Sequence, residues 1–110
     1  MKKSTRLKIG SLIWTIQKVP EDSKYLIHED GDICYGSCNP DSLTIYIQGT
    51  GLDNQLYKSY LIHELTHAFI FSTFCYTKRK FDEEELCCFM QYQAPNILET
   101  AEYVWKELFK

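Results

Sequence analysis

The chain has 110 residues, of which 45% are hydrophobic and 25% are charged, and its formal net charge is −3. This length predicts a single domain spanning residues 1–110, with the composition of an ordinary soluble globular protein. The acidic balance argues against a dedicated nucleic-acid binder, which is usually basic. No stretch approaches the ~20 apolar residues that a membrane-spanning helix needs.

The cysteines and the N-terminal residues indicate the cellular compartment. The chain has five cysteines, an odd number, and the adjacent Cys87 and Cys88 are poor disulfide partners inside a helix. The charged N-terminus is not followed by a long apolar segment or a small-residue cleavage site, as a secretion signal would be. We therefore expect a cytoplasmic protein with mostly free thiols.

The first half of the chain is expected to be β structure. Residues 7–19 are rich in β-branched and aromatic side chains and end in a turn at residues 20–23. A short strand over residues 25–27 and a strand over residues 43–47, where apolar residues alternate, follow along the chain. These signals predict a three-stranded antiparallel sheet.

The second half is expected to form three helices. Asp53 or Asn54 can cap a helix over residues 54–73, where apolar residues and two histidines recur at helical spacing. Asp82 can cap a second helix, whose acidic first turn suits the helix dipole. Pro95 suits the first turn of a third helix. The sum is an α+β domain in which a small antiparallel sheet precedes three helices.

The most informative segment lies inside the first predicted helix and reads His63-Glu64-Leu65-Thr66-His67. Residues four apart lie on one helix face with Cβ atoms about 6 Å apart, so two imidazoles can bind one Zn²⁺. Glu64 lies beside that position, where a general base for a zinc-activated water is needed. The competing interpretation is a chance match, but two histidines on one buried face would need several hydrogen-bond partners.

A catalytic zinc site needs a third protein ligand and an open fourth position. No histidine follows His67, and the extended His-Glu-x-x-His-x-x-Gly-x-x-His pattern is absent. The third ligand is therefore expected to be a carboxylate or a thiolate from a later element. Glu84 is preferred because it shares a helix face with small cysteines one turn along, and Glu85 is the alternative. Cys87 and Cys88 could themselves be ligands, although helical cysteines are more often small core residues.

These residues resemble a known family, the compact zincin-like metallopeptidases of the ImmA/IrrE type, including short versions carried by phages and mobile elements. The resemblance rests on residues 61–69, Leu-Ile-His-Glu-Leu-Thr-His-Ala-Phe, and on Glu84-x-x-Cys87-x-Phe89, which is similar to the family's third-ligand helix. It covers roughly residues 25–95. It implies a zinc-dependent endopeptidase, sometimes directed at a transcriptional repressor.

The function expected from the sequence is that of a zinc metallopeptidase acting on a peptide or protein substrate. In this hypothesis His63, His67 and Glu84 hold Zn²⁺, and Glu64 is the general base. The backbone of residues 43–47 is expected to align an extended substrate by strand addition. The candidate donors to the developing oxyanion are Tyr60, Tyr76 and Tyr92. The alternative is a non-catalytic zinc-binding domain that regulates or binds a partner.

Overall fold

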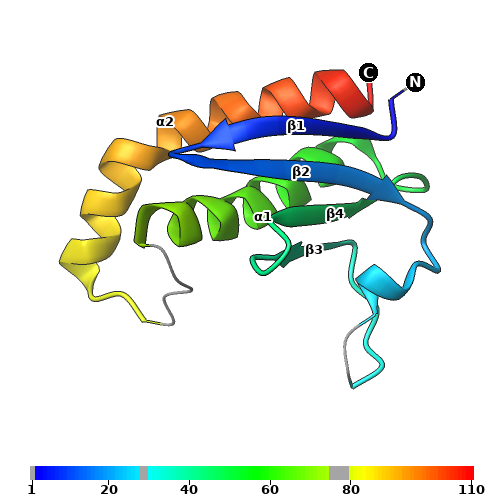
Figure 1. Cartoon of the computed structure of the whole chain (residues 1–110), viewed down its shortest axis with the longest axis horizontal. Coiled ribbons are helices and arrows are strands. Elements are labelled where there is room, and N and C mark those ends of the chain that lie inside the picture. Colours follow the sequence, from blue (N-terminus) through cyan, green and yellow to red (C-terminus); the bar gives the residue numbers. More distant parts are fainter. Residues whose placement is uncertain (1, 28–29, 75–79) are drawn as a thin grey trace.

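The computed structural model describes residues 2–27, 30–74 and 80–110, and Figure 1 traces the whole chain. The elements follow in the order β1 (Ser4–Ile9), β2 (Leu12–Val19), the 3₁₀ helix η1 (Lys24–Leu26), β3 (Gly36–Asn39), β4 (Thr44–Gln48), α1 (Asn54–Phe74) and α2 (Glu83–Leu108). The α+β class that the sequence predicts is compatible with this order. The predicted numbers of strands and helices are wrong.

The strands form one four-stranded mixed sheet in the order β1-β2-β4-β3, and not a three-stranded antiparallel sheet. Residues 7–19 contribute to two strands, because the chain reverses between Ile9 and Leu12, which pair with each other. Gly10 makes this reversal with a φ of +62°, a backbone conformation that side chains disfavour. A glycine at the first position of a two-residue hairpin loop is the signal that the sequence interpretation overlooked.

The parallel pairing of β2 with β4 comes from the path of the chain after β2. The chain crosses to the far edge of the sheet, where β3 and β4 form an antiparallel hairpin, and β4 lies between β3 and β2. The strand expected over residues 25–27 is also wrong. Ser23 caps the 3₁₀ helix η1 there, accepting a hydrogen bond from the backbone N–H of Tyr25 at 3.2 Å, and only an isolated bridge joins Ile27 to Ile33.

The helix expected over residues 54–73 is present as α1, and its first turn is capped by Asp53, whose side chain accepts a hydrogen bond from the N–H of Gln55 at 2.8 Å. Asp82 caps α2 as expected, in a capping box with Glu85. The predicted third helix is wrong because α2 continues through Pro95. Proline removes one backbone hydrogen bond and crowds the preceding turn, which bends a helix without having to end it. Figure 1 shows this bend between the yellow and orange parts of α2.

Both helices pack on the same face of the sheet, and the main core lies between these two layers (Figure 1). Its fully buried members include Trp14 and Ile16 from β2, Ile45 and Ile47 from β4, Leu61 and Leu65 from α1, and Val104 and Leu108 from α2. A smaller cluster of Val19, Leu26 and Tyr46 packs under η1 on the other face. Within the described parts of the chain, neither helix is apolar enough over sufficient length to cross a lipid bilayer.

Candidate metal centre

Helix α1 presents the His-Glu-x-x-His segment at the boundary between its buried and exposed faces. Leu61, Leu65 and Ala68 have no exposed surface and anchor the helix against the sheet. Glu64 adjoins this apolar stripe and is only 7% exposed. His63 and His67 lie beyond it on the exposed side, with ring centroids 5.0 Å apart. The four-residue spacing therefore places both imidazoles on one face, as the sequence predicts.

The donor atoms of His63, Glu64 and His67 lie within 4.8 Å of one another. His63 Nε2 lies 4.0 Å from Glu64 Oε2. Zinc binds imidazole nitrogen at about 2.0–2.1 Å, so two nitrogens on one ion are at most about 4.2 Å apart. Small side-chain rotations would bring the two imidazoles to one ion. Two imidazoles beside a buried carboxylate are thus a donor set that fits a divalent cation.

Strand β3 passes directly over Glu64 because residue 36 is glycine. A Cβ at Gly36 would lie 3.1 Å from Glu64 Cγ, 3.3 Å from Glu64 Oε2 and 3.0 Å from Ile47 Cδ1. Any larger residue would have to push the strand or the carboxylate aside. The sequence interpretation missed Gly36, although an isolated glycine in a strand is a sign of close approach to another group.

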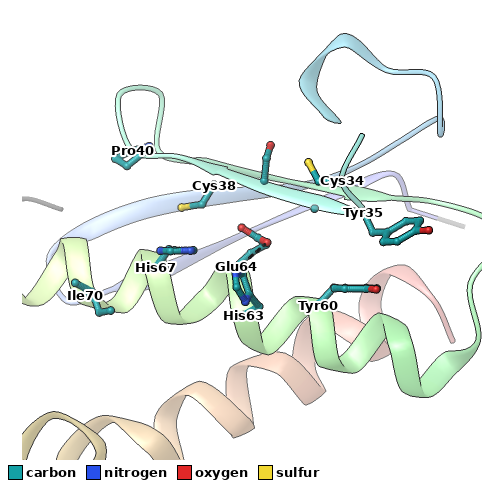
Figure 2. Close-up of a pocket in the computed structure, with 11 residues that line it drawn as sticks. Cys34, Tyr35, Cys38, Pro40, Tyr60, His63, Glu64, His67 and Ile70 are labelled. Carbon is teal, nitrogen blue, oxygen red and sulfur yellow. Dashed lines mark ion pairs between the residues drawn. The ribbon is translucent and has the colours of Figure 1, made fainter. Parts of the chain in front are cut away.

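The space between β3 and α1 is a cleft of about 510 Å³, within the usual size range of ligand sites. Its lining residues are Cys34, Tyr35, Gly36, Ser37, Cys38, Pro40, Tyr60, His63, Glu64, His67 and Ile70. Figure 2 shows Cys38, Pro40 and Ile70 near His67 at one end of the cleft. The other end is aromatic, where Tyr35 and Tyr60 pack with ring centroids 5.2 Å apart.

The environment of the cleft shifts the pKa values of His67 and Cys38. Partial burial, followed by the electrostatic effect of His63, lowers the pKa of His67 from its ordinary value of 6.5. This shift favours the neutral imidazole, which is the form that binds a metal. Burial, followed by the charge of Glu64, raises the pKa of the Cys38 thiol to about 12. The sequence analysis did not identify Cys38 as a residue of this cleft.

Glu84, the preferred third ligand, lies outside this group. Its side chain is exposed on the first turn of α2, and its Oε1 accepts a long hydrogen bond from the Cys88 thiol at 3.9 Å. Glu85 completes the capping box with Asp82 and lines a separate cleft, which also contains Cys88. Among the described residues, only His63, Glu64 and His67 form a metal-capable group. Glu84 and Cys38 both lie outside it, so Glu84 as a ligand stays a prediction.

Two further expectations about substrate binding can be compared with the fold. Strand β4 pairs with β2 on one side and β3 on the other, so the expectation that residues 43–47 align a substrate by strand addition is wrong. The strand at this edge of the sheet is β3. Of the three tyrosines, Tyr60 lines the cleft and Tyr92 lines the separate one, while Tyr76 lies outside the described residues. Figure 2 shows the Tyr60 hydroxyl directed away from Glu64.

No protein-family model, curated protein or solved structure matches this chain. The function is therefore argued from the chemistry and geometry of the site itself.

Proposed function

We propose that this protein is a zinc-dependent metallopeptidase. The observation that carries the proposal is the position of Glu64, a buried carboxylate beside two imidazoles at ligand spacing and at the floor of an open cleft. A cation next to a carboxylate favours its ionised form. A divalent cation on the neighbouring imidazoles would add such a charge beside Glu64, at the place where substrate can enter.

Each residue of the site has its own role in the proposed reaction. His63 and His67 hold the ion, with Glu84 as the third ligand predicted from the sequence. When bound, zinc would supply a Lewis acid and lower the pKa of a water molecule to about 7. Glu64 accepts the proton of the attacking water and passes it to the leaving amine. Its burial beneath β3 limits the directions in which its carboxylate can turn.

An extended peptide fits the edge of the sheet that forms the roof of the cleft. Gln48 N–H donates a hydrogen bond to the carbonyl of Tyr35 at 2.9 Å, so these two residues form a hydrogen-bonded pair. In an antiparallel ladder the alternate residues, here Gly36 and Cys38, direct their N–H and C=O groups away from the partner strand. A peptide that pairs with these groups would run along the cleft past Glu64.

We further propose a cytoplasmic location and a protein substrate. The four described cysteines, Cys34, Cys38, Cys87 and Cys88, are all free thiols, as in proteins of a reducing compartment. A transcriptional repressor is the substrate suggested by analogy with ImmA/IrrE-type peptidases. The position of β3 at the edge of the sheet supports a polypeptide substrate in general, and this argument does not depend on that analogy.

Glu64→Gln tests the proposal, because the amide preserves the shape of the side chain and cannot accept the proton. We expect the variant to keep its fold and its zinc, measured by circular dichroism and metal analysis. Its cleavage of a quenched fluorescent peptide library should fall by about 10²–10⁴-fold or more. Glu99→Gln, an exposed change on α2, is the matched control and should cleave normally.

Two other results would redirect the interpretation. A Glu64→Gln protein that cleaves at the wild-type rate would rule out Glu64 as the base. A wild-type protein that binds one zinc ion and cleaves nothing in the library would favour the alternative, a non-catalytic zinc-binding domain. His67→Ala should lose the metal in either case.

A further inference from the structure

Cys38 faces the candidate metal centre from the opposite wall of the cleft. It pairs with Ile45 in the β3–β4 ladder, and paired residues in a ladder point to the same face of the sheet. Ile45 is completely buried in the core on the helical face, so the Cys38 side chain also points toward α1. Figure 2 shows its sulfur projecting from β3 into the cleft above His67.

Cys38 reaches the candidate metal centre from the side on which a metal ion held by a helix has coordination positions left. Two imidazoles four residues apart bind from a single helix face, so the remaining coordination positions point away from α1. In this structure β3 lies on that side, close enough that a Cβ at Gly36 would touch Glu64. Residue 38 is two positions along the same strand and therefore on the same face. Cys38 places a sulfur donor where the helix cannot place one.

The chemistry of the donors is also consistent with one dication. Zinc readily binds a mixture of imidazole nitrogen and thiolate sulfur. Two neutral imidazoles, one thiolate and the nearby Glu64 carboxylate carry two negative charges, which a divalent cation neutralises. The thiolate would form by releasing its proton to water as the metal binds.

The other cysteine in the cleft is not arranged in this way. The Cys34 thiol donates a hydrogen bond to the backbone carbonyl of Leu26 at 3.1 Å, which directs it toward η1. Cys87 and Cys88 are exposed on α2, and Cys88 lines the separate cleft. Cys34 is therefore a matched control for Cys38, because it lines the same cleft from the same segment of chain.

We propose that Cys38 is a protein ligand of the metal held by His63 and His67. This inference rests on the metal site of the proposed function, but it does not require the protein to be catalytic. With Cys38 as third ligand, one position stays open for water beside Glu64. If Glu84 also binds, four protein ligands close the shell.

Cobalt substitution of the purified full-length chain tests the inference through a readout other than activity. One equivalent of Co²⁺ bound by a thiolate gives an intense sulfur-to-metal charge-transfer band in the near ultraviolet. We expect the band in the wild type, in Cys34→Ser and in the double variant Cys87→Ser/Cys88→Ser. Cys38→Ser should lose the band and bind Co²⁺ at least about tenfold more weakly, as expected when a group that holds a metal is removed.

Zinc X-ray absorption of the wild type gives a second measurement that does not depend on how Cys38→Ser folds. We expect a sulfur neighbour at about 2.3 Å from zinc. Metal binding without sulfur in that shell, or an unchanged cobalt band in Cys38→Ser, would overturn the role of Cys38 and leave the proposed peptidase intact. A wild type that binds neither metal would overturn both proposals.

The Glu84→Gln variant then distinguishes an open shell from a closed one. If Glu84→Gln keeps the sulfur-to-metal charge-transfer band and the wild-type affinity for Co²⁺, the result supports Cys38 as the third ligand, with Glu84 remote from the metal. If the variant keeps the charge-transfer band but binds Co²⁺ more weakly, the result supports Cys38 and Glu84 together as ligands that close the coordination shell of the metal.

Discussion

Gly36 lies so close to Glu64 that even a methyl side chain at this position would require the carboxylate or the strand to shift. A Cβ on Gly36 would lie 3.1 Å from Glu64 Cγ and 3.3 Å from Oε2, closer than ordinary van der Waals contact. Since Gly36 belongs to β3 and Glu64 to α1, this contact sets the height of the cleft above the His-Glu-x-x-His segment. It also restricts the positions that the carboxylate can adopt.

Gly36→Ala should therefore disturb the centre without removing any functional group. We expect a loss of about 1–3 kcal/mol in the free energy of unfolding, as for other overpacked sites, together with weaker metal binding. Urea unfolding and metal titration measure the two effects. Gly49→Ala is the control, because its Cβ would meet Lys18 Cβ at an acceptable 3.4 Å. Equal stability and equal metal affinity in the two variants would show that β3 does not press on Glu64.

A hydrogen bond between α1 and β2 helps to hold the helix that carries the site. The indole N–H of the fully buried Trp14 donates to Ser72 Oγ at 2.9 Å. Ser72→Ala should leave this N–H without its partner and reduce the free energy of unfolding by about 1–3 kcal/mol. Thr73→Ala is the control, since it also raises helix propensity and removes an exposed hydroxyl. Urea unfolding should show Ser72→Ala to be the less stable protein, and the reverse order would contradict the prediction.

The aromatic end of the cleft is expected to bind substrate rather than to stabilise the oxyanion. Tyr60 packs against Tyr35, and its hydroxyl points away from Glu64. Tyr60→Phe should leave kcat unchanged on a peptide that the wild type cleaves. Tyr60→Ala should raise KM by about 2–10-fold, the loss expected for one aromatic contact. A large fall in kcat for Tyr60→Phe would instead identify the hydroxyl as a catalytic donor.

The raised pKa of Cys38 predicts slow alkylation of the metal-free protein. Because the thiolate is the reactive form and the pKa is about 12, only about 10⁻⁴ of Cys38 is ionised at pH 8. Iodoacetamide should therefore label Cys38 at least about 100-fold more slowly than the exposed Cys87 and Cys88, as followed by mass spectrometry of peptides. The rate at Cys38 should still be rising with pH above 9. Labelling of Cys38 as fast as Cys87 at pH 8 would show that the thiol is not shielded.

The sequence was sufficient to predict those features whose signal lies within a few neighbouring residues. Helix α1 follows from the spacing of its apolar residues and from Asp53, whose cap is made within the first turn. The four-residue spacing of His63 and His67 places them on one face of any α-helix, whatever that helix packs against. The capping box of Asp82 and Glu85 is likewise complete within four residues.

Only the tertiary structure decided the order of the strands and the path of α2. Strand β4 pairs with β2 and β3, so its place in the sheet depends on where the chain travels between residues 20 and 43. Pro95 is compatible both with a helix start and with a bend, and the packing of α2 on α1 and β1 selects the bend. Local propensity predicts neither the place of β4 in the sheet nor the bend at Pro95, because each depends on contacts between distant segments.

The candidate site likewise has one part that the sequence predicts and one part that only the tertiary structure decides. Residues 63–67 predict two imidazoles and a carboxylate on one helix face, because that arrangement depends on helix geometry alone. The roof above them is a tertiary feature. Gly36 and Cys38 lie over Glu64 and His67 only because β3 is the strand beside α1, and no spacing along the chain links residues so far apart. The sequence thus determined which donors α1 presents, and the packing of β3 decided what faces them.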